Sequence, residues 1–326
     1  MKTNELKESI TKKIIEHLEN NKVPCWRKPW VNDPNCGFPT SVSTKNSYRG
    51  INILLLQLAS MTHEFNGKWW GTFNQWKKMG GSVMPRPSHV KQGQWGTNIV
   101  LYKPFEVKEV KENEEGEEEE SSSKRLYMKT FTVFNIDQVR GEKLDHLRPN
   151  IDDNSEIKHF ADYEKAEHVV ESTGADIRYV GNRAFYKSPT PYEAWPKHTD
   201  GDYIKMPPRS HYPSIEAFYS TRFHELIHWA EVRVDWKRDR SEERYAEGEL
   251  IAEMGACFLT AECGIPFDDD MKNHTDYLKI WLEKMKKDSS FIFRASTQAS
   301  KSCDYILKLA EEKEKENDAK SQRIAS

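Results

Sequence analysis

Apolar residues recur at helical spacing in the first part of the chain. Residues 4–20 and 50–61 place apolar side chains three and four positions apart, so each segment predicts a helix with one buried face. Thr72 is a suitable N-cap for a third, short helix over residues 73–79, which ends at a pair of glycines. The pattern therefore predicts three helices before the first strand.

Two later segments have the pattern of strands. Residues 98–103 and 126–134 are rich in β-branched and aromatic side chains. Between them, residues 106–122 hold 9 Glu and 2 Lys, a composition that cannot bury apolar surface. We expect a long hairpin insertion with a disordered acidic loop at about residues 106–125. A solubilising role is favoured over mimicry of a nucleic acid or shielding of a basic face, because blocks of like charge are usually only solvated.

A polar stretch with turn formers, residues 141–158, predicts a domain boundary. Beyond it, strand-like segments cover 176–187 and 202–206, and helical segments cover 159–173, 214–234, 243–262, 273–286 and 299–313, before a frayed tail. The sequence therefore predicts an α+β fold class. An N-terminal α+β domain with a small antiparallel sheet would span residues 1–145, and a mainly helical C-terminal domain would span residues 155–326.

Composition narrows the class of protein. Of the 326 residues, 31% are charged and 37% are hydrophobic, which allows a core under a strongly polar surface. No apolar run reaches the roughly 20 residues that a membrane-spanning helix needs, and the N-terminus lacks a signal-peptide core. Five cysteines without a Cys-x-x-Cys pair fit free thiols in a reducing compartment. We expect a cytoplasmic protein with no membrane partner.

The segment His224-Glu225-Leu226-Ile227-His228 is the strongest chemical signal. Residues four apart share a helix face, so His224 and His228 can both reach one ion. Glu225 is offset by about 100° around the helix, close enough to reach a metal-bound water without ligating the metal. Zinc would lower the pKa of that water towards roughly 7, and Glu225 would act as general base. The competing interpretation, two surface histidines with a solvated Glu, is disfavoured by the apolar surroundings.

A catalytic zinc needs a third protein ligand, and the next helical segment offers Glu249 and Glu253 on one face. A carboxylate on an apolar helix face is costly unless it is paired or binds a metal. The arrangement resembles the gluzincins, and this resemblance implies Glu249 as the third ligand, with Glu253 orienting a histidine ligand. The reverse assignment, a part for Glu247, and a salt bridge from Glu249 to Arg222 or Arg244 remain alternatives.

The front of the chain is basic and aromatic. Residues 1–105 hold 15 Lys and Arg against 6 Asp and Glu, although the whole chain has a net charge of −3. Six of the ten tryptophans lie there, interleaved with the cations. Single-stranded nucleic acid is commonly held in this way, with cations along the phosphates and flat rings against the bases. Most tryptophans belong in cores, so the excess of positive charge is the stronger argument.

Seven segments, taken in order, carry a family resemblance. They are residues 24–30 (PCWRKPW), 44–52 (TKNSYRGIN), 70–76 (WGTFNQW), 133–138 (VFNIDQ), 202–207 (DYIKMP), 224–229 (HELIHW) and 245–253 (YAEGELIAE). The first four resemble the N-terminal domain of the ArdC-type antirestriction proteins, and the last three resemble their zincin-like metallopeptidase domain. The Glu-rich run and Gly248 depart from the family pattern, since a Glu is usual in place of Gly248.

This resemblance implies an N-terminal domain that binds single-stranded DNA and is also seen fused to plasmid primases. It implies a plasmid- or phage-borne role in protecting incoming DNA from host restriction, and Zn²⁺ as cofactor. Within the basic front, eight residues are expected to contact DNA: Arg27, Lys28, Trp30, Lys45, Tyr48, Arg49, Asn52 and Lys77.

Three hypotheses follow for the function. The leading one is a DNA-bound metallopeptidase that hydrolyses a peptide bond in an unidentified protein substrate. The rival is a non-catalytic DNA-binding protector whose zinc site is structural or vestigial. In the third, a processing peptidase uses its basic front to bind an acidic protein.

Overall fold

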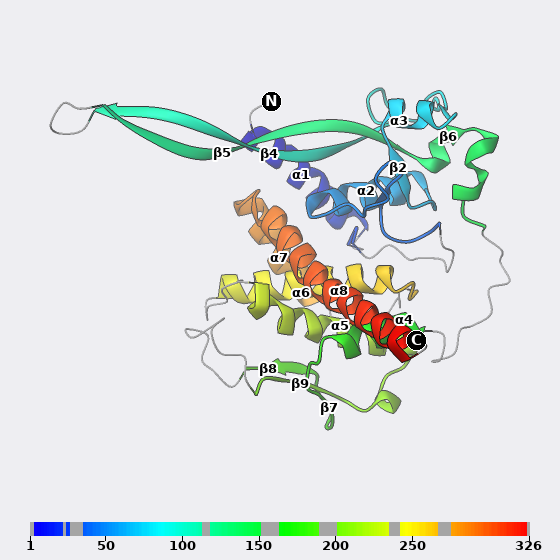
Figure 1. The fold of residues 1–326 in the computed structure, drawn as a ribbon. Coiled ribbons are helices and arrows are strands. Elements are labelled where there is room, and N and C mark those ends of the chain that lie inside the picture. The colour runs from blue at the N-terminus through cyan, green and yellow to red at the C-terminus, as the bar shows by residue number, and fades with distance from the viewer. Residues whose placement is uncertain are drawn as a thin grey trace.

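The computed structural model describes residues 3–21, 24–26, 35–112, 118–150, 163–188, 201–234, 242–266 and 275–324. These residues form helices and small sheets, so the expected α+β fold class is confirmed (Figure 1). Among them, no helix combines the length and the apolar character that crossing a membrane requires.

Three helices and a small sheet form the N-terminal half. The helices are α1 (Thr3–Asn21), α2 (Ile51–His63) and α3 (Phe73–Lys78). The sheet has the order β1-β2-β5-β4 and contains β1 (Thr40–Ser41), β2 (Trp69–Gly71), β4 (Thr97–Glu112) and β5 (Glu118–Asn135). It is not wholly antiparallel, because β1 and β2 run parallel. A separate antiparallel pair joins β3 (Ser82–Val83) to β6 (Val139–Arg140).

The acidic segment is β-structure on both sides of residues 113–117, which lie outside the described residues. Strands β4 and β5 pair antiparallel along their length and project as a ribbon from the body of the protein (Figure 1). The expected disordered loop at about residues 106–125 is therefore wrong for the described part of that range. The ladder starts at a base that includes the buried Val100 and continues in one register as far as the pair of Glu112 and Glu118.

The C-terminal half is mainly helical, as expected. Its helices are α4 (Glu164–Ser172), α5 (Ile215–Glu231), α6 (Glu242–Glu262), α7 (Thr275–Lys287) and α8 (Phe291–Ile324). A small sheet of order β7-β9-β8 contains β7 (Ile177–Tyr179), β8 (Phe185–Lys187) and β9 (Tyr203–Met206). Both β8 and β9 contact α5. Short 3-10 turns complete the described elements: η1 (Ile136–Gln138), η2 (Glu142–Leu147), η5 (Arg209–His211) and η6 (Val232–Val234).

The last helix, α8, is longer than the sequence pattern indicates. It continues to Ile324, whereas the apolar pattern ends near residue 313 and predicts a frayed tail. Its exposed end carries ion pairs at helical spacing, Lys308–Glu312 at 3.5 Å and Lys313–Glu316 at 3.5 Å. Such pairs add only about 0.2–0.5 kcal/mol each, but the residues around them are good helix formers. Helix propensity therefore extends α8 beyond its buried portion.

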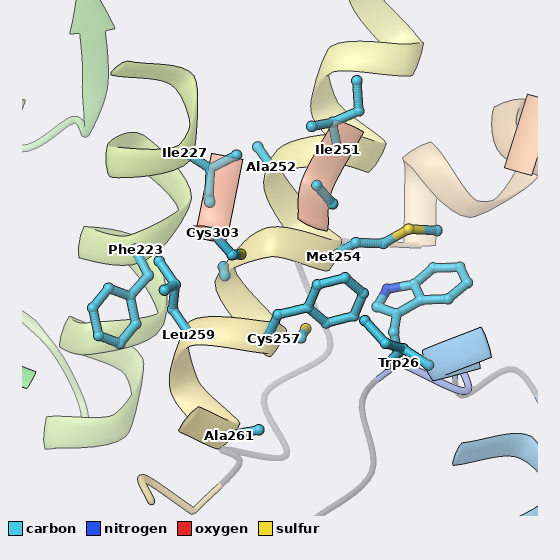
Figure 2. Close-up of a cluster of buried hydrophobic side chains, with 14 of the residues drawn as sticks. Trp26, Phe223, Ile227, Ile251, Ala252, Met254, Cys257, Leu259, Ala261 and Cys303 are labelled. Carbon is cyan, nitrogen blue, oxygen red and sulfur yellow. The ribbon is translucent and has the colours of Figure 1, made fainter. Parts of the chain in front are cut away.

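One buried cluster joins the two halves. The ring of Trp26 meets that of Trp281 in α7 edge to face, with centroids 6.2 Å apart, and Trp26 also lies beside Met254 of α6 (Figure 2). Phe38 makes a similar contact with Phe258, with centroids 5.3 Å apart. The two halves thus share apolar surface, while the proposed boundaries at residues 145 and 155 remain a prediction.

A glycine lets α5 and α6 pack closely. A Cβ atom at Gly255 of α6 would lie 2.6 Å from Cδ1 and 2.7 Å from Cγ1 of Ile227, a fully buried residue of α5. Phe223, one turn earlier on α5, lies beside Leu259 of α6 (Figure 2). These two helices carry the residues of the candidate metal centre, so Gly255 sets the separation on which that centre depends.

Gly255→Ala is expected to destabilise the protein. The added methyl overpacks the helix interface, which typically costs about 1–3 kcal/mol and outweighs the roughly 1 kcal/mol that Ala gains over Gly in a helix. Urea unfolding measures the change. Ile227→Val removes the nearest methyl, so the double variant should recover part of the loss. A Gly255→Ala protein more stable than the wild type would contradict this packing.

Candidate metal centre

Helix α5 aims two histidines in one direction. It begins at a capped end, where Ser214 Oγ accepts a hydrogen bond from the backbone N–H of Ala217 at 3.0 Å. One turn apart in its buried second half, the rings of His224 and His228 have centroids 4.9 Å apart and an interplanar angle of 84°. The four-residue spacing of the two histidines therefore places both imidazoles at one site, as the sequence predicts.

Helix α6 supplies a carboxylate to the same site. Glu249 Oε2 lies 3.5 Å from His224 Nε2, and Glu249 Oε1 lies 3.7 Å from His228 Nε2. One nitrogen from each histidine and one Glu249 oxygen lie within 4.8 Å of one another, which is the spread expected of three ligands around a single ion. The histidines and Glu249 thus form a two-His, one-Glu set of donors that could hold a metal ion.

The site opens into a cavity of about 210 Å³. His224 and Glu249 line it and are partly exposed, with 21% and 12% of their side-chain surface accessible. Residues of α5, α6 and α7 complete the wall: Ser220, Thr221, Glu253, Tyr277 and Trp281. An ion held by the three donors could therefore keep an open coordination position towards this cavity.

A further carboxylate, Glu231, contacts the ring nitrogen of His228 that faces away from Glu249. Its Oε2 lies 3.2 Å from His228 Nδ1, and its side chain is completely buried. A hydrogen bond from Nδ1–H to this carboxylate leaves Nε2 free to ligate and raises its basicity. Sequence reasoning missed Glu231, although its position three residues after His228 on the same helix would have indicated it.

Glu253 lies near His224. It lines the same cavity, is buried, and accepts a weak Cys257 Sγ–H contact at 3.9 Å. Burial lowers the pKa of His224, but the carboxylates of Glu249, Glu225 and Glu253 outweigh burial and raise this pKa to about 9. The role of Glu253 in orienting a histidine remains a proposal. The surplus of negative charge suits a bound cation.

The arginines considered as alternative partners of Glu249 form ion pairs with other carboxylates. Arg222 pairs with Glu167 at 2.8 Å, and Arg244 pairs with Glu247 at 3.3 Å. Glu247 also forms an ion pair with Arg294 at 3.2 Å. Its carboxylate therefore contacts two arginines and not the histidines. These contacts leave Glu249 as the α6 carboxylate that lies against both imidazoles.

Glu225 is buried beside the histidines, with 7% of its surface exposed. Its negative charge acts on His224 and on Tyr212, whose pKa is raised to about 12, mainly by burial. A buried carboxylate next to a ligand histidine is the arrangement that general-base catalysis needs. Its assignment as the catalytic base nevertheless stays a proposal.

The proposed DNA-contacting residues have several different surroundings. Arg27, Lys28 and Trp30 lie outside the described residues. Lys45 places its Nζ 4.5 Å from the ring centroid of Trp69, and Lys68 approaches the same ring at 4.9 Å. This cluster of two cations on an aromatic ring is the kind of surface that single-stranded DNA recognises.

Other members of that set make contacts within the fold. Arg49 forms an ion pair with Asp304 of α8 at 2.8 Å and thereby ties the two halves together. Asn52 bonds both backbone groups of Val100 at 2.8 Å, which fixes α2 to β4. Tyr48 is half-buried and Lys77 is exposed. Arg49 and Asn52 thus have structural partners, and the DNA contacts of the set remain a prediction.

Comparison with known proteins defines the class of each half. Residues 4–134 match the model of the N-terminal domain of the anti-restriction factor ArdC. Residues 164–298 match the model of the zincin-like metallopeptidases, the class to which the two-His, one-Glu geometry also points.

A solved structure extends the likeness over both halves. The crystal structure of the antirestriction ArdC protein from the R388 plasmid, in its metal-free form, is 30% identical, with a TM-score of 0.68, over 94% of this chain and 98% of that one. The chain therefore belongs to the ArdC family of antirestriction proteins. The Mn(II)-bound form of the same plasmid protein matches with a TM-score of 0.66.

Curated proteins that resemble this chain include a DNA primase and a protein of uncharacterised function. A DNA primase TraC of Escherichia coli is 29% identical over 92% of this chain, but the match covers only 20% of the primase, so the chain spans about a fifth of that relative. The protein y4eC of Sinorhizobium fredii, whose function is uncharacterised, is 26% identical over 92% of this chain and 90% of its own length.

Glu231→Gln is expected to weaken zinc binding about 10- to 100-fold, because the amide no longer increases the basicity of His228 through Nδ1. A competition titration with a chromophoric chelator measures the affinity. Glu171→Gln, an exposed change on α4, serves as the control and should bind zinc as the wild type does. Equal affinities for the Glu231 variant and the wild type would show that Glu231 does not support the metal centre.

Proposed function

We propose that this protein is an antirestriction factor of a mobile element that binds single-stranded DNA and hydrolyses a peptide bond at a zinc centre. The observation that carries the catalytic part is the convergence of ligand atoms from His224, His228 and Glu249 within 4.8 Å, beside the buried Glu225. The charge and aromatic content of the first 105 residues support the DNA-binding part. Membership of the ArdC family supports both parts.

In this proposal, His224, His228 and Glu249 hold the ion, and Glu231 keeps His228 in the ligating tautomer. Bound there, zinc would polarise a water molecule and a substrate carbonyl. Glu225 takes the proton of the attacking water and returns it to the leaving amine. The cavity of about 210 Å³ gives the peptide access to His224 and Glu249.

The DNA-binding part places a strand on the basic front. Lys45 and Lys68 can meet phosphates, and the ring of Trp69 between them can meet a base. The relation to DNA primase TraC gives a further reason to expect single-stranded DNA as a partner. We place the protein in the cytoplasm, where incoming plasmid DNA meets host restriction enzymes.

The second candidate function is a non-catalytic protector that covers incoming DNA and uses its metal only for stability. The buried position of Glu225 argues against this candidate, because a structural site has no need of a buried carboxylate beside its ligands. The protein substrate of the catalytic hypothesis is a target brought close by the same DNA.

Glu225→Gln is the variant that separates the two candidates. It should keep the fold and the zinc content, and lower peptide cleavage by about 10²- to 10⁴-fold, the usual contribution of a general base. Cleavage is measured on a library of quenched fluorescent peptides, and protection is measured as survival of transferred plasmid DNA in a restricting host. Glu164→Gln, an exposed change on α4, is the matched control. Full protection by Glu225→Gln would establish the non-catalytic protector.

A further inference from the structure

A second, larger cavity lies where the two halves meet. Its volume is about 440 Å³, and its walls come from α1, β4, α6 and the start of α8. It lies apart from the metal centre, since the two cavities have no lining residue in common. Glu247 lines it and Glu249 lines the metal cavity, so the two openings flank the same helix, α6.

The walls of this junction cavity are cationic. Lys7, Arg244, Arg294 and Lys301 line it, against a single lining carboxylate, Glu247. Glu247 is buried and its charge is already matched by Arg244 at 3.3 Å and Arg294 at 3.2 Å.

Arg294 and Lys301 differ in their partners. Arg294 also pairs with Asp288 at 2.6 Å. Lys301 is exposed and has no ion pair among the described residues. The cavity therefore keeps a positive surplus that favours an anion.

One wall residue points to a missing hydrogen-bond partner. Gln298 is 8% exposed and lines the cavity, and its side-chain Nε2 has no hydrogen-bond partner among the described residues. A buried amide donor is costly to leave unpaired, so such a group is usually satisfied by water or by a ligand. An acceptor oxygen on a bound anion would satisfy it.

An aromatic side chain completes the walls. Tyr102 of β4 lines the cavity and is 39% exposed. Burial raises the pKa of Tyr102 to about 12, so the ring is a neutral phenol. Phe293 also lines the cavity, and the Nζ of Lys7 is 5.8 Å from its ring centroid. Exposed aromatic surface beside cations suits a nucleobase next to its phosphate.

We propose that the junction cavity binds one nucleotide unit of single-stranded DNA, with the phosphate at Lys301, Arg294 and Gln298 and the base against Tyr102. This assignment rests on the proposed DNA-binding function. It places the DNA in a cavity that none of the eight residues expected from the sequence to contact DNA lines. The strand would lie against α6, on the side away from the metal ligands, and would contact both halves at once.

Lys301→Glu tests the phosphate contact. Binding of a fluorescent oligothymidylate is followed by anisotropy over a series of salt concentrations. The variant is expected to lose about 10-fold in affinity, and its salt slope should fall by about 0.7, the value for one phosphate contact on a single strand. Lys315→Glu makes the same charge change about 20 Å further along α8, beyond the Debye length, and should bind within twofold of the wild type.

Gln298→Leu tests the amide separately. It should lower DNA affinity about threefold or more without changing the salt slope, while its Tm stays equal to or rises above that of the wild type, because an unpaired buried donor is removed. A structural role for Gln298 would instead lower the Tm and leave DNA affinity unchanged.

The outcomes separate this proposal from the proposed function. If the wild type binds the oligonucleotide and Lys301→Glu binds as well as Lys315→Glu, the cavity is not the DNA site, although the protein still binds DNA. If the wild type does not bind the oligonucleotide, both proposals fail. Thymidine monophosphate should bind far more weakly than the oligonucleotide. Equal affinity would identify a free nucleotide as the occupant and would contradict the proposal that a DNA strand binds there.

Discussion

The close packing of α5 on α6 brings the donors of the candidate metal centre together. Gly255 permits it, because any side chain there would overlap Ile227. The contact sets the carboxylate of Glu249 against the two histidines that α5 presents one turn apart. A small shift of either helix would separate donors that now lie within 4.8 Å, so this centre depends on apolar packing as much as on its polar ligands.

Burying this much charge would be unfavourable without compensation. Four carboxylates, Glu225, Glu231, Glu249 and Glu253, surround two imidazoles in a mostly apolar core. Part of the charge is met by hydrogen bonds, such as that between Glu231 and His228. A divalent cation would meet the remainder, which is the physical reason to expect a metal here.

The local parts of this account could be predicted from the sequence. Helical spacing alone brings His224 and His228 to one site, and the cap of α3 follows from Thr72, whose Oγ accepts from Gln75 N–H at 3.3 Å. The choice of Glu249 needed the gluzincin resemblance, because spacing within α6 says nothing about how α6 crosses α5. Non-local facts such as the junction cavity depend on packing between halves that no sequence period encodes.

The errors also have a physical pattern. The acidic hairpin was expected to be disordered on composition, but strand pairing depends on register with a partner strand, which composition does not describe. The spacing of the motif indicates only the side of α5 that faces the metal, whereas Glu231 contacts the other ring nitrogen of His228, so the motif alone does not indicate it.

The shared core gives the two halves a mechanical connection. The Trp26–Trp281 contact and the Arg49–Asp304 ion pair both cross between them. A DNA strand bound by the N-terminal half would therefore lie at a fixed distance from the metal centre, because the two halves are packed together. This arrangement is consistent with a peptidase that acts on proteins found at DNA.

The zinc content of the purified protein tests whether His224, His228 and Glu249 hold a metal ion. We expect about one zinc per chain in the wild type, and loss of most of it in both His228→Ala and Glu249→Ala. His211→Ala, at an exposed histidine outside the centre, should retain the wild-type content. Full retention of zinc in both ligand variants would contradict the assigned centre and the function derived from it.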